Sequence, residues 1–164
     1  GTTGLVYMPP KPLICIRGKE VFEKPDLGYT LFKPDEVFSF YELRSAAIDR
    51  DEDEWCDLPA DHPKLLKAME QRIESQFQTL IQKKIRHVVF SAFGCGAFKN
   101  DPRVVASLYR KAAERHQKHF TIIVWAIYYA GNGKSNFKIF QSILNPILCD
   151  KQPVGKILRE YLSA

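Results

Sequence analysis

The order of hydrophobic and polar residues along the chain predicts strands and helices that alternate. Residues 37–47, 88–93 and 120–128 are short segments rich in β-branched and aromatic side chains, which indicates strands. Apolar residues recur at helical spacing in residues 61–84, after Asp101, in 136–145 and in 154–162. In the helix after Asp101 the predicted buried face is Val105, Leu108, Tyr109 and Ala112. The unbroken apolar run in 88–93 predicts a strand covered on both faces.

Proline and aspartate mark where the helices begin. Asp61 and Asp101 are the predicted N-caps, because a proline at a first helical turn follows each of them. Near the N-terminus, residues 5–7 and 13–17 read as short extended pieces broken by prolines, and 20–34 as a loop or irregular hairpin. The acidic residues 49–61 are predicted to form a surface loop.

This alternation predicts one α/β domain over residues 1–164, a three-layer α/β/α sandwich with a mixed, largely parallel sheet. Ligands of such sheets bind beyond the carboxyl ends of the strands. Residues 45–50, 91–100 and 128–136 should therefore converge on one rim.

Composition and charge narrow the function. The chain has 164 residues and a formal net charge of +5, but its basic residues are scattered, so direct nucleic-acid binding is not expected. Its four cysteines and four histidines show no metal-binding spacing; no metal and no cofactor are predicted. Few, unpatterned cysteines favour a reducing compartment such as the cytoplasm. No apolar run is long enough to cross a membrane, so no membrane partner is expected.

The run "SAFGCGAFKNDP", residues 91–102, is the segment most indicative of chemistry. Glycines 94 and 96 are expected to permit positive φ and a close approach of backbone N–H groups to an anion. A helix begins directly afterwards, and its N-terminus favours negative charge. The pattern is neither a Walker A loop nor GxGxxG, and it fits phosphate binding or a plain turn. Cys95 is either a nucleophile or a small residue in a tight loop.

The stretch "FSAFGCGAFKNDPRVVASLYRKAAE", followed by "FTIIVWAIYY", resembles the C-terminal half of the microbial poly(ADP-ribose) glycohydrolase-like branch of the macrodomain superfamily. "GLVYMPPKPLICIRG" and "ELRSAAIDR" are similar to upstream parts of that family. The resemblance implies an ADP-ribose ligand, free or on a modified protein. It places the diphosphate and ribose contacts on Gly94, Cys95, Gly96, Ala97, Phe98 and Asn100. Ring packing is assigned to Tyr128, Tyr129 and Asn136, with core packing as the alternative for each tyrosine.

One departure from the family limits the expected chemistry. Active members carry a glycine-rich loop followed by Gln-Glu-Glu, and this chain has neither. Catalytic residues are therefore left unassigned; Asp49 is the local acid expected to face the rim, with a salt-bridged surface role as the alternative. We expect a sandwich incomplete at its N-terminal side that needs the missing half or a second chain. The candidate functions are an ADP-ribosyl glycohydrolase in the complete form, a non-catalytic ADP-ribose reader, and a ligand-free scaffold.

Overall fold

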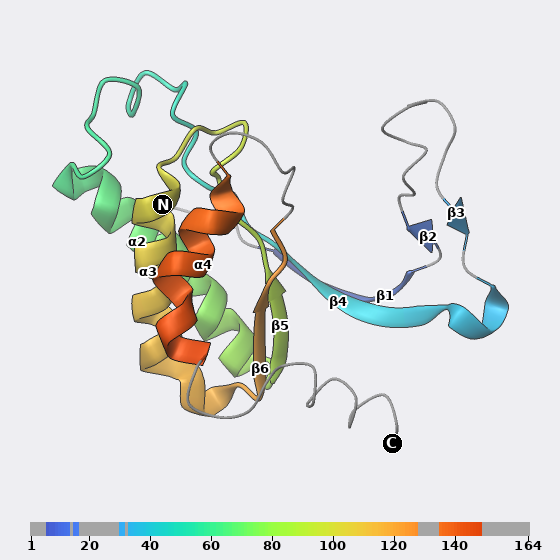
Figure 1. The fold of residues 1–164 in the computed structure, drawn as a ribbon. Coiled ribbons are helices and arrows are strands. Elements are labelled where there is room, and N and C mark those ends of the chain that lie inside the picture. The colour runs from blue at the N-terminus through green and yellow to red at the C-terminus, as the bar shows by residue number, and fades with distance from the viewer. Residues whose placement is uncertain (1–5, 14, 17–29, 32, 128–134, 149–164) are drawn as a thin grey trace. The chain divides into compact units, whose positions relative to one another are not determined.

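The structure is a computed structural model that describes residues 6–13, 15–16, 30–31, 33–127 and 135–148 (Figure 1). The chain divides into two compact units, Thr2–Ser45 and a second that runs from Ala46 onward. Each unit has its own strands, and they are described separately below.

The first unit is built from antiparallel strand pairs. Its elements are β1 (Val6–Leu13), β2 (Cys15–Ile16), β3 (Thr30–Leu31), the 3₁₀ helix η1 (Pro34–Glu36) and β4 (Phe38–Arg44). β1 pairs with β4 from Val6↔Arg44 to Leu13↔Phe38, and β2 pairs with β3. The predicted strand over 37–47 is thus present, but it ends at Arg44.

The prolines do not interrupt β1, so the prediction of two pieces broken at prolines is wrong. The strand passes through all three of them, and its register with β4 shifts between Met8 and Lys11. Pro9 and Pro10 lie within this irregularity, where a bulge removes the need for regular ladder hydrogen bonds.

The second unit contains a parallel strand pair and three helices. Its elements are α2 (Pro63–Gln82), β5 (His87–Phe90), α3 (Pro102–His116), η2 (Gln117–His119), β6 (Ile122–Trp125) and α4 (Asn136–Leu148). β5 and β6 pair in parallel from His87↔Ile122 to Phe90↔Trp125. Both strands are shorter than predicted, and the predicted helix 154–162 lies outside the described residues. None of the described helices combines the length and apolarity needed to span a bilayer.

Helices α2 and α3 begin at a proline, as predicted, but one of the two predicted caps is shifted by a residue. Asp101 caps α3, and its Oδ1 accepts a hydrogen bond from the Arg103 amide at 2.8 Å. The predicted cap Asp61 is wrong, because His62 caps α2 and accepts from the Lys64 amide through Nδ1 at 3.2 Å. Pro63 is the first helical residue and therefore places the cap at position 62.

Aromatic side chains form the core of the second unit. The Phe77 ring of α2 is fully buried and lies 5.1 Å from Phe90 and 5.6 Å from Phe120, measured between ring centroids. Tyr109 of α3 packs 5.2 Å from Phe90 and donates a buried hydrogen bond to Gln76 Oε1 at 2.8 Å. The predicted inner face of α3 is confirmed, because Val105, Leu108, Tyr109 and Ala112 are all buried.

The described helices of this unit cover one face of the β5–β6 pair. Figure 1 shows α2, α3 and α4 on the same side of the two strands. On these strands the Val89 side chain is 68% exposed and Val124 is 38% exposed, so the prediction that both faces of β5 are covered is wrong here. The α/β class with a parallel strand pair is confirmed.

Candidate ligand-binding site

The loop between β5 and α3 is folded by its own backbone. The amides of Cys95, Lys99 and Asn100 donate to the carbonyls of Ala92, Gly96 and Gly94, each at 3.0 Å. Such a network of short turns fixes the path of the loop before any ligand arrives.

Gly94 is the residue of this loop that must be glycine. Its φ is +69°, in the left-handed region. A Cβ at this position would lie 2.5 Å from Ala47 Cβ and 2.7 Å from Asn100 Nδ2. Gly96 is different: its φ is not positive, and a Cβ there would meet nothing within 4 Å, so the expectation of positive φ at Gly96 is wrong.

Asn100 joins the loop to the segment that leads out of β4. Its side chain is only 6% exposed, and its amide nitrogen donates to Ile48 O at 2.7 Å and Gly94 O at 3.0 Å. The Arg50 amide adds a bond to Phe98 O at 3.2 Å. The predicted meeting of the 45–50 and 91–100 segments is confirmed over residues 46–50. Sequence reasoning placed Asn100 at the ligand, whereas its amide contacts here are to backbone carbonyls.

The start of α4 also reaches this loop. Asn136 Nδ2 donates to the Cys95 carbonyl at 3.3 Å, which brings the last residue of the third predicted segment to the same place; residues 128–134 of that segment lie outside the described residues. Tyr128 and Tyr129, the predicted ring-packing residues, lie outside the described residues. In this structure the Asn136 side chain therefore supports the loop by a hydrogen bond to the loop's backbone.

The outer side of the loop presents unpaired donors. Gly96, Ala97 and Phe98 are exposed and consecutive, and their N–H groups donate to no other group in the described part of the chain. Consecutive free amides on a pre-formed turn are suited to hold an anion. The amino end of α3 is less available, because the Asp101 carboxylate already accepts from the Arg103 amide there.

Cys95 has the environment of an unreactive thiol. It is half-buried, and its Sγ lies 3.5 Å from the Phe93 carbonyl. Burial and the nearby negative charge of Asp101 raise the pKa of the Cys95 thiol to about 12. The nucleophilic thiolate is therefore scarce at neutral pH, which favours the interpretation of Cys95 as a small loop residue.

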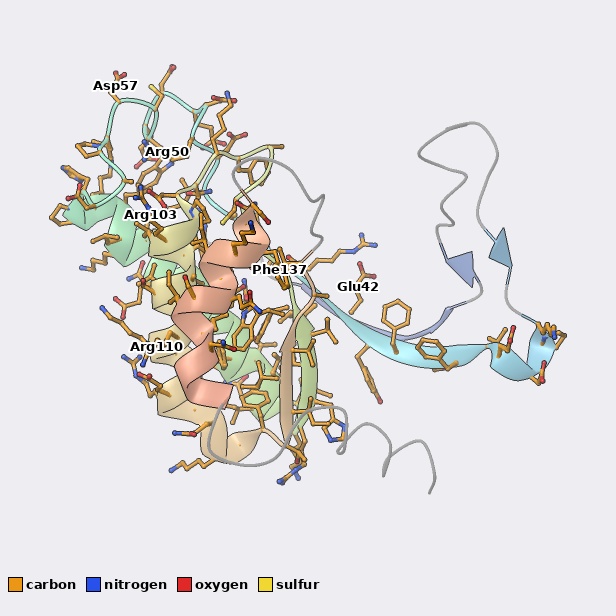
Figure 2. The ribbon with its side chains drawn as sticks, in the orientation of Figure 1. Glu42, Arg50, Asp57, Arg103, Arg110 and Phe137 are labelled. Carbon is orange, nitrogen blue, oxygen red and sulfur yellow. The ribbon has the colours of Figure 1, made fainter. Side chains whose placement is uncertain are left out.

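A cavity of about 590 Å³ opens beside the inner side of the loop. Cys95, Asn100 and Asn136 line it together with apolar side chains from the three helices, namely Leu65, Met69, Val105 and Ile139. Arg50 and Arg103 also line it, and Figure 2 shows both near the beginning of α3. Of the predicted site residues, Cys95, Asn100 and Asn136 thus line the cavity, whereas Gly96, Ala97 and Phe98 lie exposed on the outer side of the loop.

The acidic segment is engaged in local contacts. Asp49 Oδ1 accepts from the Asp51 amide at 3.0 Å, and Asp51 forms a 2.7 Å ion pair with Lys99. Asp49 forms no ion pair within 4.0 Å among the described residues, but its negative charge adds to that of Asp51 in raising the pKa of Lys99. Nor do three or more of the described His, Cys, Asp and Glu side chains gather where they could hold a metal.

Comparison with solved structures identifies the fold. No protein-family profile and no curated protein sequence matches the chain. Poly(ADP-ribose) glycohydrolase from Deinococcus radiodurans in complex with ADP-ribose matches with a TM-score of 0.71 at 22% identity, over 87% of this chain and 53% of that one. Its apo form gives a TM-score of 0.72 at 21% identity, over 89% and 55%. The enzyme from Thermomonospora curvata gives 0.67 at 21% identity, over 85% and 46%.

The chain thus has a macrodomain-like α/β fold. More particularly, its fold is that of the bacterial poly(ADP-ribose) glycohydrolases, so the resemblance seen in the sequence is confirmed at the level of the fold. The chain spans about half the length of these structures.

Proposed function

We propose that this chain binds ADP-ribose, and that the N–H groups of Gly96, Ala97 and Phe98 hold its diphosphate. The observation that carries this proposal is the set of three consecutive exposed residues whose N–H groups have no partner among the described residues. Two phosphates offer several acceptor oxygens close together, which matches donors spaced along one turn. The structural neighbour solved with ADP-ribose supports this choice of ligand.

The loop is pre-organised for this role. Gly94, Asn100 and Asn136 fix its inner side through the contacts described above, so little conformational entropy is lost when an anion binds outside. Exposure of Phe98 also leaves an aromatic side chain next to the proposed diphosphate. A ring there is able to pack on a ribose or a base.

Calorimetric titration tests the binding step. We expect ADP-ribose and ADP to bind and adenosine to bind far more weakly, because adenosine lacks the diphosphate. Gly96→Val should weaken ADP-ribose binding at least tenfold by filling the open space over the amides, while Gly96→Ala, the smaller matched change, should weaken it less. If both variants bind ADP-ribose as strongly as the unaltered protein, the loop is not part of the site. If the unaltered protein does not bind ADP-ribose, the ligand-free scaffold becomes the favoured function.

For catalysis, we propose that hydrolysis of an ADP-ribosyl bond requires more than this chain. The chain spans about half the length of the glycohydrolase that it matches. In the acidic segment, residues 49–57, the carboxylates of Asp49 and Asp51 are already engaged in local contacts. The chain alone is expected to release no ADP-ribose from a modified protein. The same assay separates a hydrolase from a reader. Release of ADP-ribose only after the remaining half is added would indicate an enzyme, and no release with or without that half would indicate a reader. Turnover by residues 1–164 alone would instead assign the chemistry to the acidic segment.

The exposed strand face is consistent with such a partner. Parallel strands are normally covered on both sides, yet Val89 and Val124 are exposed on β5 and β6. We propose that the other half of a glycohydrolase-length domain, or a second chain that replaces it, covers this face. Contact of that kind would bury apolar surface worth about 25 cal/mol per Å².

A further inference from the structure

The last residue of the loop turn carries a positive charge. The Lys99 amide donates to the Gly96 carbonyl at 3.0 Å, so Lys99 closes the turn that presents the N–H groups of residues 96–98. A β-turn is less than about 7 Å across, so Lys99 lies close to the same three N–H groups. Its side chain is 65% exposed and carries the ammonium on a flexible four-carbon stem. The ammonium is therefore able to reach an anion that these amides hold.

One exposed ion pair engages the Lys99 ammonium in this structure. Its Nζ lies 2.7 Å from Asp51 Oδ1, a residue 48 positions away in the sequence. The Asp51 side chain is 60% exposed, and its own amide donates to Asp49 Oδ1 at 3.0 Å. Both partners are thus open to water, and exposed ion pairs of this kind contribute little to stability. A stronger acceptor is therefore able to take Lys99 from Asp51 at low cost.

The neighbouring cation Arg103 is less available than Lys99. Its Nε and Nη2 atoms donate to the two oxygens of the Asp101 carboxylate, at 3.2 and 2.7 Å. Such a bidentate pair is stronger and more directional than a single ammonium contact. Asp101 is itself fixed, because it caps α3. Of these two cations beside the loop, Lys99 is the one that a ligand is able to recruit.

The backbone at Lys99 is unfavourable for a side chain. Its φ is +55°, in the left-handed region where glycine is preferred. Gly94 is also left-handed and has no room for a Cβ, whereas position 99 keeps a long charged side chain at the same kind of cost. Strained positions of this kind concentrate at ligand contacts and switch segments. The strain at Lys99 therefore points to a role for its ammonium.

The acidic segment runs alongside this turn and gives that ammonium something to offset. The Arg50 amide donates to Phe98 O at 3.2 Å, which ties the segment to the turn. The hydrogen bond and charge of Asp51, with the charge of Asp49, raise the pKa of Lys99, so both carboxylates act at this place. An anion on the turn amides is repelled by these charges. A cation that contacts the anion offsets the repulsion, and a lysine-to-phosphate hydrogen bond is charge-assisted.

We propose that Asp51 and the diphosphate of ADP-ribose compete for Lys99, whose ammonium leaves Asp51 and binds a phosphate oxygen when the ligand occupies the loop. This inference rests on the proposed function, because it takes the diphosphate to lie on the amides of residues 96–98. Lys99 is then a further ligand-binding residue, and Asp51 is an internal competitor that lowers the affinity for the ligand. The exchange also releases the Asp51 carboxylate, so ligand binding changes the contacts of the acidic segment.

Calorimetric titration of ADP-ribose into single and double variants tests the competition. Lys99→Gln should weaken binding about tenfold, because a charge-assisted hydrogen bond is lost. Asp51→Asn should strengthen binding about twofold to fivefold, the range that an exposed ion pair contributes. In the Lys99→Gln background, Asp51→Asn should change the affinity by less than about twofold, because its effect acts through Lys99.

A second ion pair of the acidic segment supplies matched controls. Lys64 and Glu54 form a 2.9 Å pair with side chains 52% and 56% exposed, and Lys64 lies in the first turn of α2. Lys64→Gln and Glu54→Gln should each leave the affinity within about twofold. Lys99→Gly separates the charge from the backbone, because glycine suits the left-handed φ. It should bind as weakly as Lys99→Gln while melting no lower than the unaltered protein.

The possible results distinguish this inference from the proposed function. Unchanged binding in both Lys99 variants, or a gain in Glu54→Gln equal to that in Asp51→Asn, would overturn the competition and leave the proposed function standing. Unchanged or weaker binding in Asp51→Asn would overturn it as well. ADP-ribose binding that depends on Lys99 and Asp51 but survives Gly96→Val would support the competition and refute the amide site. No binding by the unaltered protein would refute both.

Discussion

Replacing Gly94 with alanine should destabilise the protein far more than the same change at Gly96. Alanine in the left-handed region costs about 1–2 kcal/mol by itself. Its Cβ would also stand 2.5 Å from Ala47 Cβ and 2.7 Å from Asn100 Nδ2, well inside van der Waals contact. To relieve that overlap Asn100 must move, and each buried hydrogen bond it then loses costs about 1–3 kcal/mol. The expected loss is about 3–5 kcal/mol, a large share of the stability of an ordinary domain.

Urea denaturation measures this loss, with Gly96→Ala as the matched control. Trp125 reports on the second unit, because its ring lies 6.0 Å from Phe90 and 6.1 Å from Tyr109 in the core. Gly96→Ala meets open space and ordinary backbone, so its free energy of unfolding should stay within about 0.5–1 kcal/mol of the parent. Equal stability of the two variants would refute the argument that Ala47 and Asn100 enclose Gly94.

Three further predictions follow from the loop, the α3 cap and the strand face. Because the pKa of Cys95 is raised to about 12, alkylation of a variant that retains Cys95 as its single cysteine should be very slow at pH 7–8 and should accelerate towards pH 12. Cys95→Ala should keep its affinity for ADP-ribose. Rapid labelling of Cys95 at pH 7 would contradict the buried thiol. Hydrogen bonds from Arg103 hold the pKa of Asp101 below its ordinary value, so the stability that the Asp101 carboxylate contributes is present above about pH 4 and is lost as the pH falls through its lower native pKa. Asp101→Asn should therefore flatten the acidic part of the curve of melting temperature against pH. The same acidic decline in the variant and the parent would show that Asp101 is not its source. Val89→Lys should reduce self-association in sedimentation velocity with little change in melting temperature, since the side chain is 68% exposed; a large drop in melting temperature would show that Val89 is covered.

The sequence predicted those features of the fold that depend on neighbouring residues, such as helix starts and the buried face of a helix. Asp101 followed by proline gave the start of α3, and the helical spacing of Val105, Leu108 and Ala112 gave its buried face. The cap of α2 was missed by one residue, because both Asp61 and His62 are able to cap and the register of Pro63 decides between them. The loop was found through its glycines and the helix that follows it.

Contacts between distant segments could not be predicted in the same way. Ala47 leaves no room for a Cβ at Gly94, and the side chain of Asn100 is held by Ile48 O; both partners lie about fifty residues earlier in the chain. The ion pair of Lys99 with Asp51 joins residues 48 positions apart, so it is not visible in the order of the residues either. For the same reason the prolines of β1 could not be assigned to an irregular part of the β1–β4 ladder before the register was known.

The inner side of the loop is fixed by Gly94 and Asn100, whereas the N–H groups on its outer side have no partner among the described residues. This difference determines which positions of the loop are able to change during evolution. Ala47, Gly94 and Asn100 enclose one another, so a larger residue at any one of them is tolerated only together with compensating changes at the others. Ala97 and Phe98 carry no such linkage through their exposed side chains. Related chains are therefore free to vary residues 97 and 98, and with them the ligand they prefer, without losing the shape of the loop, whereas the inner three residues should be kept or replaced as a group.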